Sequence, residues 1–279
     1  MTPTQLRQAV LMVCVLDGVD LTPHAGGVVL PATPGTNASK DIFISWERVA
    51  GIVGETDDPT NTATRSALTQ WFTLARDLCD SAVTLESSAF FDQFCVIALP
   101  HDCDNHPGQE WVRDVVPGEL IHRGLGIKEQ LHLQRQATVV PAGLLEILDL
   151  DPQRCWESAL DYLDTMAQLA SKRHKSDPSQ TLRPMGSCDV ITLLGSTTFR
   201  TALASHHEVG MRALAVPMRT RGWVDPNHLD SAFTRGAAAA TTAPDRGFSV
   251  AVLVTADGVW PAKDGSNLVE FALRGFLDR

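Results

Sequence analysis

The chain has 279 residues, of which 44% are hydrophobic and 20% are charged, a balance typical of an ordered globular protein. The 33 acidic against 23 basic residues give a formal net charge of −10, which argues against binding to nucleic acid or to an anionic membrane surface. A local basic cluster could still bind a small anion, because salt screens the more distant charges over roughly 8 to 10 Å.

The cysteines and the N-terminal segment indicate where the protein resides. The six cysteines include no Cys-x-x-Cys pair, and most stand in apolar runs, which is typical of reduced core thiols rather than of disulfides or a zinc site. The apolar run at residues 9–16 is too short to span a bilayer, which takes about 20 residues, and no small-x-small cleavage pattern follows it. We therefore expect a soluble cytoplasmic protein.

The predicted elements of the first third of the chain are mainly helical. A Thr-Pro pair, which suits an N-cap and a first helical turn, opens a predicted helix over residues 3–18. After a connection rich in glycine and proline, a strand is expected over residues 41–45, and its last residue, Ser45, would cap a helix over residues 46–53. Residues 61–79 carry apolar side chains on one face and predict a long amphipathic helix.

The middle third has a less regular pattern. The apolar run at residues 94–99, stopped by a proline, suits a buried strand better than a helix, although periodicity cannot separate the two at this length. Strands are also expected within residues 118–127 and 137–140, and a helix over residues 142–148. An Asp-Pro pair then opens a clear amphipathic helix over residues 151–172.

The long helix and the segment after it bear on the core and on domain organisation. Trp156 and Leu163 stand seven residues apart on the apolar stripe of this helix, so we expect both in the core. The polar stretch at residues 172–186 is the best candidate for an exposed connection or a subdomain boundary. We otherwise expect the whole chain, residues 1–279, to form a single α/β domain.

Beyond residue 187, predicted strands and helices alternate. Their order is a strand at residues 189–194, a helix at 197–205, a strand at 211–218, a helix at 225–240, a strand at 248–255 and a helix at 267–277. This βαβ-type alternation predicts an α/β fold in which a mixed, largely buried sheet is flanked by helices.

No motif specific to a cofactor or a catalytic centre is present. The chain has no Gly-x-Ser-x-Gly nucleophile elbow, no Walker phosphate loop and no His-Glu-x-x-His pair. Gly124-Leu125-Gly126 lacks the third glycine of a dinucleotide fingerprint, so a strand or turn that needs glycine is the better interpretation. We therefore expect no bound cofactor.

Three polar segments contain residue types that could bind a metal ion or act in catalysis. The segment His-Asp-Cys-Asp-Asn-His at residues 101–106 is rich in potential metal ligands, but so short a loop cannot usually surround an ion alone, which favours a solvated polar turn. The segment His-His-Glu at residues 206–208 suits a helix terminus better than a catalytic base. Cys188 is disfavoured as an activated thiol, because the neighbouring Asp189 opposes the thiolate. No metal ion is expected.

One further group of residues is a stronger candidate for a binding site. Leu194 is predicted to end a strand, and the residues after it turn directly into a helix, which would point free backbone amides and hydroxyls to one spot. If the strand at residues 211–218 runs parallel beside it, two arginines reach the same sheet edge, where α/β proteins bind ligands. The candidate ligand-binding residues are Gly195, Ser196, Thr197, Thr198, Arg219 and Arg221. In the alternative interpretation, Ser196 only caps its helix and both arginines pair with surface acids.

The leading functional hypothesis is therefore a binding protein or enzyme for a small anionic metabolite that carries a phosphate or a carboxylate. No residue is assigned a catalytic role, because no nucleophile and base are predicted to meet. The alternative is a non-catalytic protein interaction or assembly module. Converging polar groups in a concave pocket would favour the first class, and an exposed apolar patch would favour the second.

Overall fold

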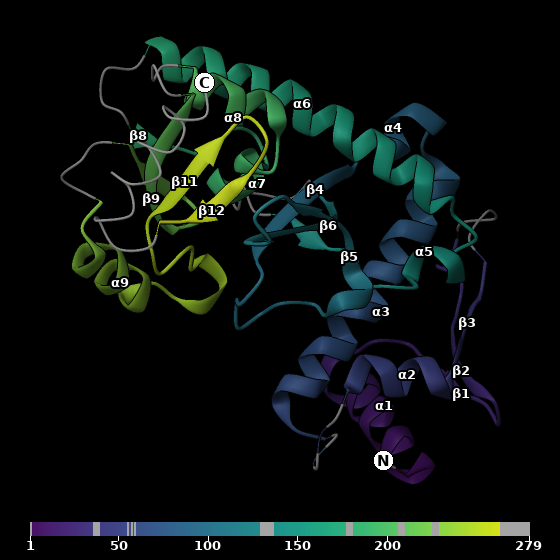
Figure 1. Cartoon of the computed structure of the whole chain (residues 1–279). Coiled ribbons are helices and arrows are strands. Elements are labelled where there is room, and N and C mark those ends of the chain that lie inside the picture. The colour runs from purple at the N-terminus through teal and green to yellow at the C-terminus, as the bar shows by residue number, and fades with distance from the viewer. Residues whose placement is uncertain are drawn as a thin grey trace. The chain divides into compact units, whose positions relative to one another are not determined.

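The structure is a computed structural model that describes residues 2–35, 40–54, 56, 58, 60–128, 137–176, 181–205, 210–224 and 229–262. Helices and strands are both abundant, and the described strands pair antiparallel in three sheets (Figure 1). The expected mixture of helix and sheet is therefore confirmed. The chain forms two compact units, one of Met1–Phe90 with Pro141–Pro152 and one of Phe91–Val140 with Gln153–Arg279. The single domain stays a prediction.

In the first unit, α1 (Pro3–Asp17) begins and ends where the sequence predicts. The side chains of Thr2 and Gln5 cap its first turn reciprocally, and Gly18 ends it with a left-handed φ of 71°. The buried residues of α1 recur at helical spacing, and the helix packs against α3 (Thr62–Thr84). Local capping and one apolar face are therefore sufficient to place both helices.

A small antiparallel sheet accompanies these helices. It consists of β1 (Thr22–Pro23), β2 (Gly27–Leu30) and β3 (Ile42–Ser45), which pair in chain order. The last residue of β3 caps α2 (Trp46–Val53), as predicted. Two short helices, α4 (Ser87–Phe91) and α5 (Leu144–Ile147), follow later in the chain, and α5 contacts β3.

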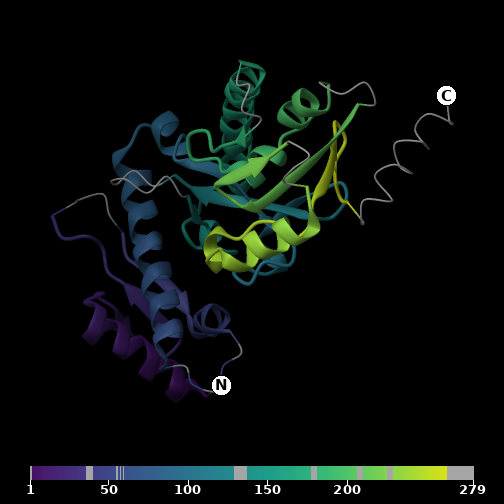
Figure 2. The same cartoon turned by 90° about the vertical axis from the view of Figure 1, so that its left-hand side faces the viewer.

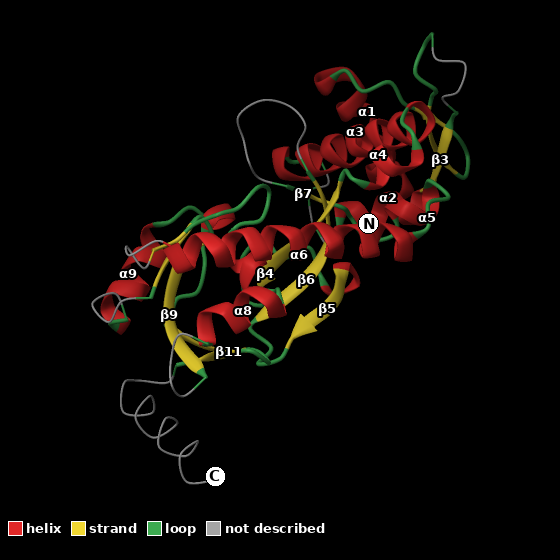
Figure 3. Ribbon diagram, turned by 90° about the horizontal axis from the view of Figure 1, so that it is seen from above, coloured by secondary structure: helices red, strands yellow, loops and turns green. Residues whose placement is uncertain are grey.

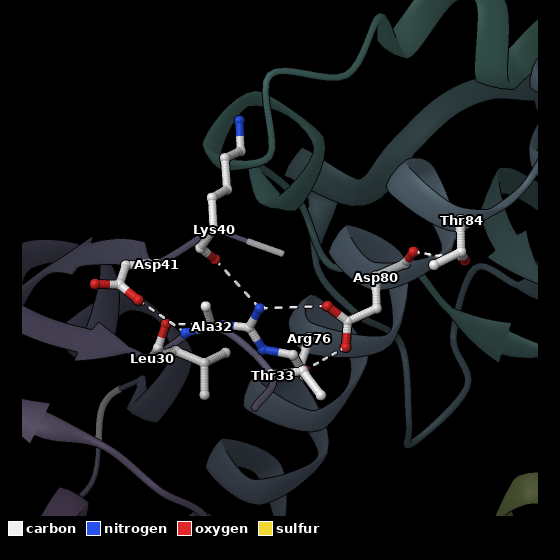
Figure 4. A network of polar contacts seen from close by, with 8 residues as sticks. All are labelled: Leu30, Ala32, Thr33, Lys40, Asp41, Arg76, Asp80 and Thr84. Atoms are coloured by element: carbon white, nitrogen blue, oxygen red, sulfur yellow. Dashed lines mark hydrogen bonds and ion pairs between the residues drawn. The ribbon is translucent and has the colours of Figure 1, made fainter. Parts of the chain in front are cut away.

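Arg76 of α3 ties down both ends of the connection between β2 and β3. Its guanidinium donates to the carbonyl oxygens of Leu30 at 2.8 Å and Lys40 at 3.2 Å, and it pairs with Asp80 at 3.5 Å (Figure 4). The hydroxyl of Thr33 donates to the same Asp80 carboxylate. The side chain of Arg76 is only 14% exposed, so these bonds form in a largely desolvated position, where they are stronger than on the surface.

We expect Arg76→Ala to lower the free energy of unfolding by about 1.5 to 3 kcal/mol, because charged hydrogen bonds to two carbonyls are lost together. Arg65, also on α3, pairs with Asp17 at 3.3 Å in a more exposed position and provides the control. Arg65→Ala should cost no more than about 1 kcal/mol. Urea denaturation followed by circular dichroism measures both, and equal losses would contradict the role given to Arg76.

The second unit contains two sheets, of which the first is built around β6 (Ile121–Ile127). β6 lies between β4 (Phe94–Pro100) and β5 (Val112–Val116), and β7 (Thr138–Val139) also pairs with it. Every residue of β4 is buried, which explains the continuous apolar run that predicts this strand. Residues 118–120, expected in the same strand as β6, form the turn before it.

The second sheet of this unit has five strands in the order β12-β11-β9-β10-β8. Their bounds are Thr181–Leu182 for β8, Met211–Met218 for β9, Arg221–Trp223 for β10, Val252–Thr255 for β11 and Val259–Pro261 for β12. α8 (Thr197–Ala204) lies on one side of the sheet and α9 (Ser231–Ala240) on the other (Figures 1 and 2). The predicted strand at residues 211–218 is thus present, whereas that predicted at 248–255 is shorter and begins only at Val252.

The long helix α6 (Pro152–Ser176) runs beside α8 (Figure 3). Leu163 is 2% exposed, so its predicted place in the core is confirmed. Trp156 is only half-buried, which corrects the expectation that it belongs to the core. The fully buried line instead passes through Cys155, Ala159 and Leu163, because the inward face is centred on those positions and Trp156 stands at its border.

The expected strand at residues 189–194 is wrong, because these residues form a helix, α7 (Val190–Leu194). Asp189 caps it by accepting a hydrogen bond from the amide of Thr192 at 2.7 Å. All five residues of α7 are buried, and so short an apolar run has the same composition in a buried helix as in a buried strand. β9 also pairs antiparallel with both of its neighbours, so the parallel arrangement that motivated the predicted site is wrong as well.

Some predicted segments differ from the structure or lie partly outside the described residues. α6 ends at Ser176 and so extends into the polar stretch at residues 172–186. The role of that stretch as a subdomain boundary stays a prediction. The start of the helix expected at residues 225–240, and all of that expected at 267–277, lie outside the described residues.

The six cysteines are free, as predicted. Burial raises the pKa of Cys95 to about 12, which keeps this thiol protonated.

Candidate anion-binding site

The predicted site begins at the turn between α7 and α8. Gly195 and Ser196 form this turn, and Ser196 is the N-cap of α8, although its side chain makes no capping hydrogen bond. Ser196 is buried. The first amides of any α-helix have no acceptor within the helix, so the start of α8 presents donors at this point.

The two threonines after the turn have internal partners. The hydroxyl of Thr197 accepts a hydrogen bond from Arg200 at 3.0 Å. The hydroxyl of Thr198 donates to the carboxylate of Asp164 on α6 at 2.7 Å. A carboxylate at a helix N-terminus is favourable, because the helix dipole is positive there. Asp164 therefore already occupies the kind of position that a bound anion would take.

The two predicted arginines lie where β9 turns into β10. Arg219 follows β9, and its guanidinium pairs with Asp189 at 2.6 Å and donates to the carbonyl oxygen of Pro244 at 3.2 Å. Because Asp189 is the N-cap of α7, Arg219 lies at the N-terminus of that helix. Its pairing with an acid is what the alternative interpretation of the sequence predicts. Arg221, the first residue of β10, is exposed. Among the described residues, neither arginine forms a hydrogen bond or ion pair with residues 195–198.

Two other arginines converge on the turn instead. The carbonyl oxygen of Gly195 accepts a hydrogen bond from Arg123 of β6 at 2.9 Å and one from Arg200 of α8 at 3.0 Å. Arg123 also forms an ion pair with Asp114 of β5. Arg200 stands one helical turn after Ser196, a spacing that could have drawn attention to it. Arg123 could not have been found in this way, because only the tertiary fold brings β6 to the turn.

Arg200 is a buried cation with neutral partners. It is 4% exposed, and its guanidinium donates to the Thr197 hydroxyl and to the carbonyl oxygens of Leu194, Gly195, Ala256 and Asp257. Within the described part of the chain, no carboxylate lies at ion-pair distance from it. Burial, and then the charge of Arg123, lower the pKa of Arg200 to about 10, whereas the charge of Asp257 acts in the opposite direction. The group therefore stays charged at neutral pH.

Arg123 is the second unusual cation of the turn. Burial lowers the pKa of its guanidinium. Its Nε atom is buried and has no hydrogen-bond partner among the described atoms. Two guanidiniums therefore share the carbonyl oxygen of Gly195, and of the two only Arg123 forms an ion pair with a described carboxylate, that of Asp114.

The other candidate segments of the sequence are two glycines of β6 and two polar segments. Gly124 and Gly126 lie inside β6, packed against the side chains of Trp111 and Ile97, so the strand that needs glycine is confirmed. Residues 101–106 form a polar turn, and residues 206–208 lie outside the described residues. No group of described histidines, cysteines and carboxylates has an arrangement that could hold a metal ion.

Among the helices that the structure describes, none combines the length and the apolar character needed to cross a membrane. Comparison of the chain with protein-family models, with curated proteins and with solved structures finds no match.

Proposed function

We propose that the protein binds a small anionic metabolite, carrying a phosphate or a carboxylate, at the arginine turn, defined as residues 194–200 together with Arg123. The observation that carries this proposal is the buried guanidinium of Arg200, which donates to neutral acceptors and has no carboxylate within ion-pair distance among the described residues. Buried charges in proteins are normally paired, because an isolated one loses its hydration without compensation. An anion would supply that pairing.

The chemistry of the turn suits an oxyanion. Arg123 has an unused buried Nε donor, and guanidinium groups bind carboxylate and phosphate through two parallel hydrogen bonds. The amides at the start of α8 add donors of fixed direction. An anion would have to compete with Asp164 for the hydroxyl of Thr198, so that carboxylate acts against binding. No residue is assigned a catalytic role, so the proposal covers a binding protein and an enzyme alike.

Isothermal titration with inorganic phosphate, pyrophosphate and citrate tests the proposal. We expect Arg123→Gln to weaken binding by about 1.5 to 3 kcal/mol, or roughly 10- to 150-fold, because a charged hydrogen-bond donor is lost. Asp164→Asn should strengthen binding, because it removes a competing negative charge. Arg113→Gln, an exposed arginine of β5, is the matched control and should leave the affinity unchanged.

The same titration decides between the two pairs of arginines. Arg219 and Arg221 remain part of the predicted site, so Arg219→Gln and Arg221→Gln are measured alongside Arg123→Gln. A loss for Arg219→Gln and Arg221→Gln, but not for Arg123→Gln, would favour the arrangement expected from the sequence. Absence of binding for all three anions would rule out the proposal and leave the arginines as structural caps of the carbonyls at the end of α7.

The alternative function, a non-catalytic interaction or assembly module, has one observation in its favour. Leu11, Val15 and Leu16 of α1 are 50%, 78% and 57% exposed, an unusual amount of apolar surface for one helix. This class predicts no anion binding, so the titration distinguishes the two functions.

As part of the main proposal, we place the protein in the cytoplasm, without nucleic-acid or membrane partners. Six free thiols and a net charge of −10 support that assignment.

A further inference from the structure

Two histidines join the loop at residues 101–108 to the neighbouring sheet. Nε2 of His106 and Nδ1 of His122, a residue of β6, are 2.9 Å apart. The backbone amide of Gly108 donates to Nδ1 of His106 at 3.1 Å. The two rings lie nearly perpendicular, at 81°, with centroids 5.0 Å apart. Two consecutive hydrogen bonds therefore connect the loop to the strand, one from Gly108 to His106 and one between His106 and His122.

The geometry determines which nitrogen carries each proton. Because the Gly108 amide is a donor, Nδ1 of His106 must be the acceptor and carries no proton. The proton of neutral His106 is then on Nε2, from where it is donated to Nδ1 of His122. His122 in turn keeps its own proton on Nε2. Both rings are neutral in this arrangement, and both have the same tautomer.

Neither ring can take up a proton without losing a hydrogen bond. Protonation of His106 places a proton on Nδ1, where it opposes the amide of Gly108. Protonation of His122 places a proton on Nδ1, where it opposes the proton on Nε2 of His106. We propose that His106 and His122 form a pH-sensitive latch that holds the loop at residues 101–108 against β6 when both rings are neutral and releases it when either ring is protonated.

The surroundings of the pair also favour its neutral form. The residues that pair with His122 across the sheet, Leu99 and Val115, are apolar. Burial lowers the pKa of His106, and the charges of His122 and His101 lower it further. Burial and the charge of His101 lower the pKa of His122, whereas Glu119 acts in the opposite direction. The folded pKa values lie below the ordinary value, so the hydrogen-bonded latch is favoured at neutral pH and is lost as the pH falls through them.

The other charged groups of the loop do not replace the latch. Asp104 pairs with Arg246 at 2.6 Å, which ties the middle of the loop to the segment after α9, but Arg246 is 37% exposed and Asp104 is 61% exposed. Asp102 lies 3.9 Å from His101 on the exposed side. Both contacts are therefore screened by solvent, and salt weakens them further.

Release of the loop would uncover part of the core. The ring of His106 stands edge-on to that of Trp111 with centroids 5.8 Å apart. Trp111 forms a buried cluster with Ile97 and Leu99, and the half-buried Cys103 of the loop packs against this cluster. Acid would thus expose an apolar surface on this sheet that is covered at neutral pH.

Hydrogen exchange on the full chain tests the latch. We expect amides in the peptide covering residues 101–111 to be protected at about pH 8 and to lose protection on the order of tenfold at about pH 5, after correction for intrinsic exchange. His122→Phe should exchange rapidly at both pH values, because phenylalanine fills the space without accepting a hydrogen bond. His101→Phe is the control and should keep the pH dependence. Protection that is equal at the two pH values in the unmodified protein would overturn the proposal.

A spectroscopic measurement on the unmodified protein is decisive even if a variant fails to fold. Long-range proton–nitrogen correlation spectra distinguish the two imidazole tautomers. At neutral pH both His106 and His122 should show a protonated Nε2 and an unprotonated Nδ1. A His106 ring with its proton on Nδ1 would exclude the hydrogen bond from Gly108 and with it the latch.

Discussion

Replacing Trp111 with alanine should lower the free energy of unfolding by about 3 to 5 kcal/mol. The side chain, which ends the short helix η1 (Gln109–Trp111), is 3% exposed, and its indole Nε1 donates to the carbonyl oxygen of Leu125 at 3.0 Å. Its ring lies directly on Gly124, where a Cβ atom would come within 2.2 Å of the ring. The substitution would leave a cavity on this face of the sheet and remove one of the two hydrogen bonds that the Leu125 carbonyl oxygen accepts, the other coming from the amide of Val140 at 3.0 Å.

Gly124 provides the complementary experiment. Gly124→Ala should cost about 1 to 3 kcal/mol through overpacking, and it should cost less in a chain that already carries Trp111→Ala, because the atoms that clash are then gone. Val115→Ala, a change in a 39% exposed residue of β5, is the control and should stay within about 0.5 kcal/mol. Equilibrium unfolding in urea measures all four chains. Strictly additive losses for Trp111→Ala and Gly124→Ala would show that the ring and the glycine are not in contact.

Leu163→Ala should destabilise the protein by about 2 to 5 kcal/mol. Leu163 is 2% exposed, and its neighbours one helical turn away on the buried face, Ala159 and Ala167, are small. No larger side chain on this line of α6 can therefore fill the space that the substitution leaves.

The matched substitution on the same helix is Trp156→Ala. Because Trp156 is half-buried rather than fully buried, we expect it to cost less than Leu163→Ala, although tryptophan is the larger side chain. Leu169→Ala, at 44% exposure, should be nearly neutral. The midpoints of denaturant unfolding rank the three, and a larger loss for Trp156→Ala would mean that α6 is rotated relative to the core.

The elements that the sequence predicts well are those whose signals are local. α1 and α2 begin at side chains that cap them, and α3 and α6 are long enough for apolar spacing to separate a helix from a strand. α7 is a helix that local signals do not identify. Its five residues are all buried, so the sequence has no alternation of polar and apolar positions with a helical period. The cap at Asp189 is the only local sign of a helix.

The candidate site shows the same division. A polar turn ahead of a helix at residues 195–198 can be identified from the sequence, because Ser and Thr at a helix start are local features. Its arginines could not be assigned, since pairing Arg219 with that turn required a parallel sheet, whereas Asp189 is the partner that the antiparallel fold provides. Arg123 and His122 come from adjacent positions of β6, and their side chains bond to Gly195 and His106, respectively.

By itself, then, the sequence determined the mixed α/β class, the long helices, the buried strand β4 and the free cysteines, all of which follow from composition, caps and apolar spacing. The tertiary structure alone decided the antiparallel order of the strands, the burial of Arg200 with no described carboxylate at ion-pair distance, and the meeting of His106 with His122. The physical reason is that caps and periodicity act over one or two turns of chain. Strand order and side-chain convergence depend instead on which distant surfaces pack together, and many sequences with the same local pattern could pack differently.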